Sequence, residues 1–330
     1  MKRWLMGLLA LGFCGVAVMA AAFWWLNRPM PLNADTAELS IDLGTSPREI
    51  AQGWTDAGVQ VSPTLLYEWF RWSGQARKIR AGSYEIARGT TPVMLLNKLV
   101  RGDETMAVVR LIDGWTFRQF RAELAKADSL KPTIVGLSDA QVMALLGEPD
   151  KSPEGRFYPD TYAYSKGSTD IAVLKRAHHA MQQRLEMAWA ERAADTPLRS
   201  ADEALVLASI VEKETGTAAD RAKVASVFVN RLRIGMPLQT DPTVIYGMGQ
   251  QFDGNLRKKD LSTDTPYNTY LRAGLPPTPI SMPGRAALLA TVRPEQSKAL
   301  YFVSRGDGSS EFSESLADHN RAVNKFQRGK

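Results

Sequence analysis

Two amphipathic helices in succession, at about residues 201–216 and 219–234, are the feature of this sequence that most constrains its fold. Placed on a period of 3.6, the apolar residues of each helix form one stripe. In the first helix that stripe also takes in Glu214, whereas Glu212 falls roughly opposite, beside two small residues. The pattern therefore predicts a glutamate that projects from the apolar face at the end of a helix.

The predicted position of Glu214 has a chemical consequence. A carboxylate on an apolar face loses solvation, and this raises its pKa. The last turn of a helix also disfavours negative charge and acts in the same direction. A carboxylic acid that stays protonated near neutrality is what general-acid cleavage of a glycosidic bond requires. The structural alternative is a solvated helix end that carries a Glu-Lys-Glu charge cluster.

A polar segment follows the second helix and precedes another short one. It reads Gln239-Thr240-Asp241-Pro242. An aspartate followed by proline has the form of an N-cap with proline at the first helical position. We therefore expect Asp241 to act as a cap more than as a catalyst, although a capping carboxylate can still line a cleft.

Several long motifs, in the right order, resemble the YceG-like family of endolytic murein transglycosylases. They read ASIVEKETG, KVASVFVNRLRIGMPLQTDPTVIYGMG, PYNTYLRAGLPPTPISMPG and a late YFV…HN. The resemblance is dense from Gly155 to Asn324 and thinner back to about Leu39. One departure is Thr278, where the family usually has glycine after paired prolines.

The resemblance implies a bacterial enzyme that cuts the glycan strands of peptidoglycan in the periplasm. It places the essential acid at the second glutamate of the EKE run, Glu214; a register shift of one motif position would implicate Glu212 instead. The family chemistry needs no carboxylate nucleophile, because the muramic acid's own primary hydroxyl closes an anhydro ring. Candidate supporting or substrate-binding residues are Glu212, Gln239, Thr240, Asp241, Tyr267, Asn268 and Tyr270.

Two other functions stay open from the residues alone. The first is a hydrolase that uses the same acid and water, with Asp241 as a base; its products would carry reducing ends instead of anhydro-muramyl ends. The second is a non-catalytic glycan-binding or scaffold protein of the wall-synthesis machinery. That protein would tolerate Glu214→Gln.

An uncharged apolar run from Trp4 to Leu26 is long enough to cross a bilayer. Two basic residues precede it and Arg28 follows, which favours an N-terminus in the cytoplasm. A cleaved signal peptide with its site near Ala20 is the alternative. Aromatic residues at 23–25 favour a retained anchor, so we expect a single-pass protein of the cytoplasmic (inner) membrane whose catalytic domain lies in the periplasm.

The expected fold class is α+β, with a transmembrane helix, a small LysM-like α/β module and a mixed α+β catalytic domain. The boundaries are 1–28 for the cytoplasmic tip and anchor, 29–107 for a linker and the module, and 108–330 for the YceG-like domain. Before the catalytic motifs, a strand, a glycine turn and a threonine-capped helix recur three times; the threonines are Thr45, Thr90 and Thr116.

The first two of these repeats resemble the LysM-like region of the family, a strand–helix–helix–strand module that recognises N-acetylated glycans. Aromatic residues at 67–72 could stack on sugar rings, or could equally belong to the core of the module. The module could also serve only as a spacer between membrane and active site.

Composition excludes several classes of function. The net charge of +6 over 330 residues is modest and no arginine-rich arm is present, so we expect no nucleic-acid partner. Cys14 is the only cysteine and lies in the apolar run, which leaves neither an internal disulfide nor a thiolate metal site. His178 and His179 are adjacent and cannot face the same way on a helix. We expect no metal and no cofactor; the expected partners are glycan strands, with peptidoglycan synthases as candidates.

Overall fold

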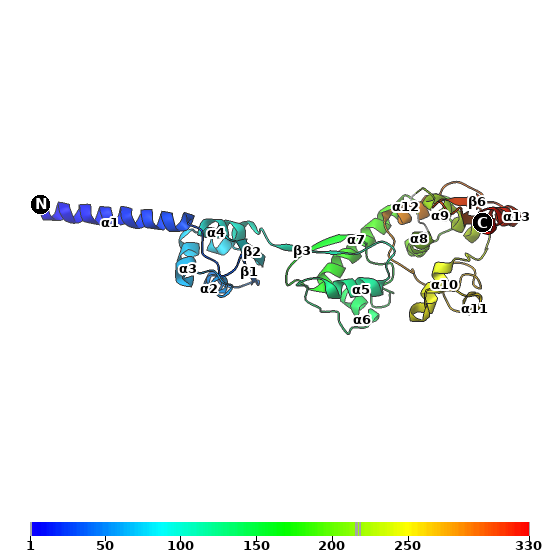
Figure 1. The fold of residues 1–330 in the computed structure, drawn as a ribbon, viewed down its shortest axis with the longest axis horizontal. Helices are drawn as coiled ribbons and strands as arrows, with labels where there is room; N and C mark the ends of the chain where they lie inside the picture. Colours follow the sequence, from blue (N-terminus) through cyan, green and yellow to red (C-terminus); the bar gives the residue numbers. More distant parts are fainter. Residues whose placement is uncertain (1, 215–216, 218, 330) are drawn as a thin grey trace. The chain divides into compact units, whose positions relative to one another are not determined.

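The structure, a computed structural model, describes residues 2–214, 217 and 219–329, and side chains from Gly12 onward. The chain divides into two compact units (Figure 1). Unit 1 consists of Met1–Ala107, Asp128–Leu130 and Ala163–Ser168, and unit 2 of Val108–Ala127, Lys131–Tyr162 and Thr169–Lys330. Strands β3 (Met106–Arg110) and β4 (Thr161–Ser165) pair with each other, and the division passes through both.

Unit 1 is built on one antiparallel pair of strands. In chain order its elements include α1 (Lys2–Asn27), β1 (Thr36–Ile41), α2 (Pro47–Asp56), α3 (Pro63–Trp72), the 3₁₀ turn η1 (Ala76–Lys78), β2 (Gly82–Ala87) and α4 (Pro92–Arg101). Strand β1 pairs with β2 from Thr36↔Ala87 to Ile41↔Gly82, and α2 and α3 connect them. The strand–helix–helix–strand order is therefore present. Trp54, Phe70 and Tyr84 are fully buried and form the centre of the core.

Two of the three expected threonine caps are wrong by one residue. Ser46 and Thr91 accept the capping hydrogen bonds of α2 and α4, while Thr116 caps α5 as expected. Thr45 and Thr90 instead donate their hydroxyls to carbonyls of the preceding turn, those of Asp42 and Ala87. A short polar side chain can satisfy either group, and pattern alone does not separate the two roles.

Residues 29–37, where we expected the linker to begin, lie against the rest of unit 1. Met30 is buried, its backbone N–H donates to the carbonyl of Thr90, and that of Asn33 donates to Gly58. The aromatic side chains of α3 differ in burial. Phe70 is in the core, whereas Trp72 is 81% exposed.

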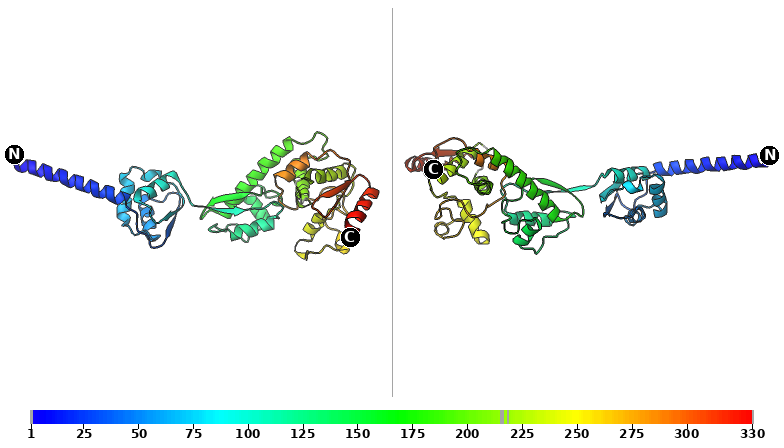
Figure 2. Two further views of the ribbon diagram at one scale, coloured as in Figure 1. Left: turned by 45° about the horizontal axis from the view of Figure 1, so that its top comes forward. Right: turned by 180° about the vertical axis from the view of Figure 1, so that it is seen from behind.

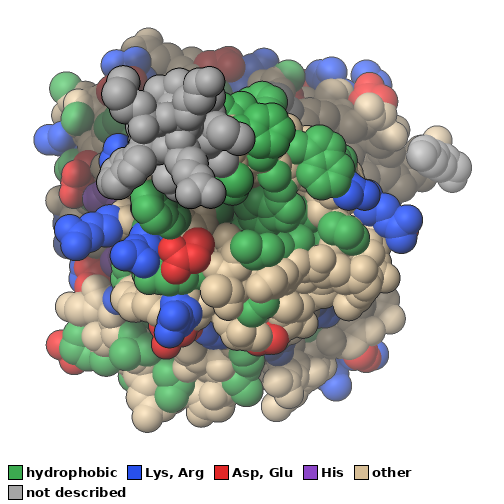
Figure 3. All heavy atoms as spheres, turned by 90° about the vertical axis from the view of Figure 1, so that its left-hand side faces the viewer, with side chains coloured by type: hydrophobic (Ala, Val, Ile, Leu, Met, Phe, Trp, Pro, Cys, Tyr) green, Lys and Arg blue, Asp and Glu red, His purple; other side chains and the backbone are tan. Residues whose placement is uncertain are grey.

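The expected anchor corresponds to α1, although the side chains of its first residues, up to residue 11, lie outside the described part. Within the part of the chain that the structure describes, none of the helices combines the length with the hydrophobicity that a membrane span requires. Figure 3 shows hydrophobic side chains gathered in the upper half of the face that it draws. Exposed large hydrophobic residues of α1 are Phe13, Val16, Val18, Met19, Phe23 and Trp24.

Unit 2 is mainly helical, with short strands, so the expected α+β class is confirmed. Its helices are α5 (Phe117–Lys126), α6 (Asp139–Leu145), α7 (Asp170–Ala190), α8 (Ala201–Glu214), α9 (Arg221–Arg233), α10 (Asp241–Met248), α11 (Lys258–Leu261), α12 (Arg285–Val292) and α13 (Leu316–Val323). Strands β5 (Tyr301–Ser304) and β6 (Ser310–Ser313) form an antiparallel hairpin.

Helix α8 lies at the centre of unit 2, where α7, α9 and α12 pack around it (Figure 2). All residues from Ala204 to Val211 are buried, so this middle part of the helix has no solvent-facing side, whereas Asp202 and Lys213 near its ends are exposed. The expectation of two contrasting faces is therefore wrong, because neighbours cover the small residues as well as the large ones. Glu214 and Glu212 at its end thus both enter packed surroundings.

Candidate active site

Glu214 is the last residue of α8 and is half-buried. The hydroxyl of Thr240 donates a hydrogen bond to its Oε1. Burial raises the pKa of the Glu214 carboxyl, and the charge of Asp241 adds to this; the hydrogen bond from Thr240 and the Arg231 guanidinium act in the opposite direction. The site therefore holds a carboxyl that keeps its proton more tightly than a solvated glutamate, with a hydroxyl fixed against it.

Thr240 is held rigidly in the segment before α10. It is 1% exposed, its backbone N–H donates to Thr269 Oγ1 at 3.1 Å, and its carbonyl accepts from Thr243 Oγ1 at 2.7 Å. The preceding Gln239 has a φ of 50° and donates its N–H to the Thr269 carbonyl at 3.0 Å. Few non-glycine residues adopt this φ, because it costs conformational energy. The hydrogen bonds of Gln239 and Thr240 to Thr269 offset that cost and hold the turn. The exposed Gln239 side chain makes no hydrogen bond to any described residue.

Asp241 does not cap α10, which corrects the sequence prediction. Helix α10 begins at Asp241 itself, Thr240 occupies the N-cap position without a side-chain cap bond, and Pro242 is the second helical residue. The exposed Asp241 carboxylate instead accepts from the Tyr270 hydroxyl at 2.6 Å. Burial, together with that bond, raises the pKa of Tyr270, so its hydroxyl remains a donor. Glu214, Thr240, Asp241 and Tyr270 thus form one connected group.

Arg231 belongs to the same surroundings, and sequence reasoning missed it. It is 7% exposed on α9, and its guanidinium donates to the carbonyls of Leu300 at 2.7 Å and Leu238 at 2.7 Å. It also lies over the Tyr301 ring, 5.4 Å from the centroid. Its position one turn beyond the buried Phe228 could have indicated a buried arginine, because an arginine on an apolar stripe needs hydrogen-bonding partners.

The Glu212 carboxylate contacts residues outside the group formed by Glu214, Thr240, Asp241 and Tyr270. Its Oε2 accepts from the Gly284 backbone N–H at 2.9 Å, and its Oε1 lies 3.7 Å from Arg221. Burial raises its pKa, while Gly284 and Arg221 oppose the shift and Asp113 adds to it. The side chain is 9% exposed. Glu212 is therefore engaged by a backbone donor and a cation, and it does not join the Thr240 group.

Asn268 and Tyr267 have supporting positions. Asn268 is fully buried; its amide donates to the carbonyls of Leu261 and Thr263, and its oxygen accepts from the Tyr270 N–H at 2.9 Å. It therefore positions Tyr270 through the backbone. The hydroxyl of Tyr267 pairs with Thr278 at 2.8 Å, and its ring meets Tyr246 edge-on.

A third buried carboxyl, Glu154, was also missed. It is 5% exposed and accepts from the Phe117 N–H at 3.0 Å and from the Tyr246 hydroxyl at 3.1 Å. Burial raises its pKa to about 7. It lies in the PEGRFYPD segment, where it connects the start of α5 to α10. Among the described residues, no group of three or more His, Cys, Asp or Glu side chains is placed to hold a metal ion.

Comparisons with known proteins identify the family of this chain. The model of the YceG-like family matches residues 39–325. An endolytic murein transglycosylase of Bacillus subtilis is 32% identical over 88% of this chain and 85% of its own length. One of Streptococcus pneumoniae is 25% identical over 90% of this chain, which spans only 60% of that relative.

A solved structure is also similar. It is described as a putative yceG-like protein of Listeria monocytogenes, with 27% sequence identity and a TM-score of 0.54 over 87% of this chain and 98% of that one. The family match covers most of the chain and includes the helix that carries Glu214. The chain belongs to the YceG-like family.

Proposed function

We propose that this protein is an endolytic lytic transglycosylase that cleaves the bond between N-acetylmuramic acid and N-acetylglucosamine in peptidoglycan, with Glu214 as its acid. The relatives named endolytic murein transglycosylase support the reaction class. The observation that carries the residue assignment is the Glu214 carboxyl, whose pKa burial raises and which faces a fixed hydroxyl. That environment suits a group that must donate a proton near neutrality.

One carboxyl serves both halves of the reaction. Protonated Glu214 gives its proton to the glycosidic oxygen as the bond to muramic acid breaks. The resulting carboxylate then takes the proton of the sugar's primary hydroxyl, whose oxygen closes the anhydro ring. The carboxyl is protonated again at the end of the cycle. No water is consumed, and no covalent glycosyl-enzyme intermediate is formed.

The neighbours of Glu214 stabilise the two charge states in turn. Between the two steps Glu214 is negative, and the Thr240 hydroxyl donates to it while the buried Arg231 charge attracts it. Asp241 opposes this state and favours reprotonation. Tyr270 and the exposed Gln239 side chain are the groups of this region that we assign to substrate contact, and Asn268 positions Tyr270.

A membrane-tethered location completes the proposal. Helix α1 covers 26 residues, which is about 39 Å of helix, and carries exposed aromatic residues near its end. We assign it as a single-pass anchor with the N-terminus in the cytoplasm and the rest of the chain in the periplasm. The enzyme would then meet newly made strands close to the membrane, terminate their elongation, and act beside peptidoglycan synthases. The β1–α2–α3–β2 order of unit 1 supports a LysM-like module.

The reaction is tested by the ends of the products. Purified peptidoglycan is digested by the full chain and the fragments are resolved by mass. Anhydro-muramyl ends, lighter by one water than reducing ends, are expected from the wild type. Reducing ends would make the protein a muramidase with water as acceptor, and an absence of cleavage on both isolated and nascent strands would leave only a binding role.

The location is tested separately by topology reporters at the C-terminus. A reporter that is active only outside the cytoplasm should be active on the full chain, which should also sediment with membranes. Activity of a cytoplasm-only reporter would contradict the assigned orientation. Release of the chain into the soluble periplasmic fraction would instead indicate a cleaved signal peptide.

A further inference from the structure

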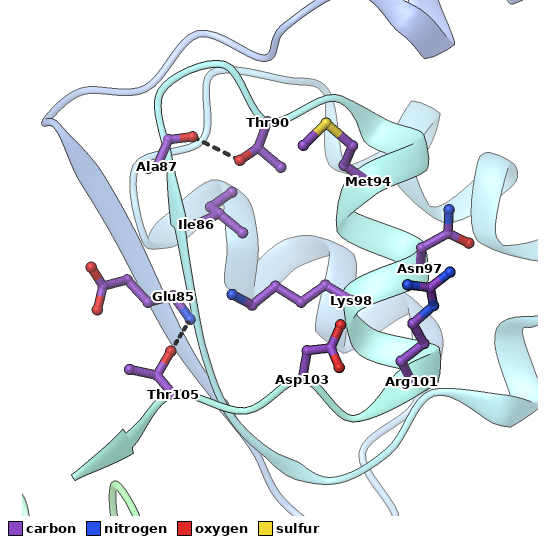
Figure 4. Close-up of a pocket in the computed structure, with 10 residues that line it drawn as sticks. All are labelled: Glu85, Ile86, Ala87, Thr90, Met94, Asn97, Lys98, Arg101, Asp103 and Thr105. Carbon is purple, nitrogen blue, oxygen red and sulfur yellow. Dashed lines mark hydrogen bonds between the residues drawn. The ribbon is translucent and has the colours of Figure 1, made fainter.

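A cavity of about 550 Å³ lies in unit 1, between β2, α4 and residues 103–105, outside the group around Glu214. One wall is the face of α4 that carries Met94, Lys98 and Arg101 (Figure 4). The opposite wall is the edge of β2 from Glu85 to Ala87. The remaining lining residues are Thr90, Asn97, Asp103 and Thr105.

The cavity offers positive charge without a fixed partner. Lys98 is half-buried and extends across the cavity toward β2 in Figure 4. Neither Lys98 nor Arg101 forms an ion pair with a carboxylate of the described residues. The Glu85 carboxylate points away from the cavity in the same view, so Asp103 is left as the acidic side chain that faces it. Two cationic side chains that line one cavity without an ion pair can donate charge-assisted hydrogen bonds to an anionic ligand.

The β2 wall offers backbone groups as well. Strand β2 pairs with β1 along one edge only. On the other edge the Glu85 N–H donates to Thr105 Oγ1 at 3.0 Å, and the Ala87 carbonyl accepts from Thr90 Oγ1 at 2.7 Å. Alternate residues of a strand direct their backbone groups to the same edge, so the Glu85 carbonyl and the Ala87 N–H also face this side. An extended peptide can add to such an edge.

We propose that this cavity binds the carboxylate-bearing peptide attached to the muramic acid of peptidoglycan, with the carboxylate on Lys98 and Arg101 and the peptide backbone along β2. The identity of the peptide rests on the proposed function. The exposed Met94 supplies apolar contact for small side chains, and Asp103 accepts from an amine or amide. An uncharged sugar would leave both cations without a partner, which is why the peptide and not the glycan fits this site.

Binding is measured with the full chain carrying Glu214→Gln, so that no substrate is consumed. The probes are a synthetic murein tetrapeptide with a free C-terminal carboxylate, its C-terminal amide, and an N-acetylglucosamine oligomer. Lys98→Met is compared with Lys78→Met, which removes an exposed lysine of the same unit that does not line the cavity. Lys98→Met should weaken tetrapeptide binding roughly tenfold or more, because a charge-assisted hydrogen bond is lost. Lys78→Met should leave it unchanged.

The amide should bind more weakly than the free acid, and Lys98→Met should not change binding of the sugar oligomer. Equal tetrapeptide affinity in Lys98→Met and Lys78→Met would overturn the proposal. So would loss of sugar binding in Lys98→Met, which would make the cavity a glycan site. Wild-type cleavage of peptidoglycan is assayed in parallel: intact cleavage with no peptide binding refutes this inference alone, whereas binding without cleavage refutes the proposed reaction alone.

Discussion

The two sides of the end of α8 each hold a glutamate, and they differ in what contacts the carboxyl. On one side Glu212 accepts from a backbone N–H and lies beside Arg221. On the other side Glu214 faces one hydroxyl, that of Thr240, in a group that also contains Asp241 and Tyr270. Burial raises the pKa of both carboxyls.

The comparison shows that a raised pKa does not identify a catalytic acid. Burial raises the pKa of Glu154 to about 7. Both of its carboxyl oxygens, however, accept hydrogen bonds, one from the Phe117 N–H and one from the Tyr246 hydroxyl. Glu212 is engaged in a similar way by Gly284 and Arg221. What distinguishes Glu214 is the combination of a raised pKa, a single hydroxyl partner and a buried cation nearby that favours the ionised state.

The largest expected effect is on turnover. Glu214→Gln should lower kcat by roughly 10²–10⁴-fold, the range that general acid–base catalysis contributes. Its free energy of unfolding should be unchanged or higher, because an amide replaces a buried acid without a charge to desolvate. Rates on peptidoglycan and urea unfolding measure the two effects. Wild-type turnover in this variant would remove Glu214 from the mechanism.

Glu154→Gln should change the pH dependence of stability, and not the reaction. The folded-state pKa of Glu154 is raised from 4.5 to about 7, so stability is fully present below 4.5 and is lost as pH rises through about 7. The loss is on the order of 3 kcal/mol. In the variant this loss should be absent, so urea unfolding at a series of pH values should show a flatter profile. An unchanged profile would mean that Glu154 does not titrate as described.

Glu212→Ala should destabilise the protein by about 1–3 kcal/mol, because it leaves the Gly284 N–H and Arg221 without an acceptor. Glu212→Gln keeps an acceptor oxygen and should cost less. Both folded variants should turn over within a few-fold of wild type. A loss of turnover in Glu212→Gln as large as that in Glu214→Gln would erase the distinction between the two sides of α8.

Thr240→Val should shift the pH profile of kcat. The hydrogen bond from Thr240 lowers the pKa of Glu214, so its removal should raise that pKa. An acid works while protonated, and the alkaline decline of kcat should therefore move to higher pH. The stability cost should be about 1 kcal/mol, as for one hydrogen bond. A shift to lower pH would contradict a hydrogen bond from Thr240 to Glu214.

Asp241→Asn should shift the pH profile of kcat in the direction opposite to Thr240→Val, and it should have the smallest effect on stability. The charge of Asp241 raises the pKa of Glu214, so its removal should move the alkaline decline of kcat to lower pH. The side chain is exposed, and its free energy of unfolding should change by no more than about 0.5 kcal/mol. Reducing-end products that disappear in this variant would instead indicate that Asp241 is a hydrolytic base.

Local signals in the sequence predicted the helices and the place of Glu214 well. The apolar stripe of α8 places Glu214 at its end, and the PLQTDP segment begins a short helix as expected, although Thr240 and not Asp241 precedes it. The error has a local cause: Thr and Asp both cap helices, and the choice depends on the turn that Gln239 adopts with its φ of 50°.

Long-range contacts could not be predicted in the same way. Periodicity placed Glu212 opposite Glu214 but gave it no partner, and the backbone N–H of Gly284, 72 residues later, donates to its carboxylate. Arg231 is stabilised by the carbonyls of Leu238 and Leu300, which no pattern within α9 reveals. Burial of α8 on all sides likewise depends on how α7, α9 and α12 pack, and a single helix does not encode that.

The central claim is that the surroundings of Glu214 raise its pKa above that of a solvated glutamate, as its role as the acid requires. The most direct measurement is a ¹³C NMR titration of labelled glutamate carboxyls in the full chain, with the Glu214 signal assigned by its loss in Glu214→Gln. A Glu214 signal that titrates above the ordinary value of 4.5 is the predicted result. A signal that titrates at or below 4.5 would leave the group ionised before the bond is broken, and would contradict its role as the acid.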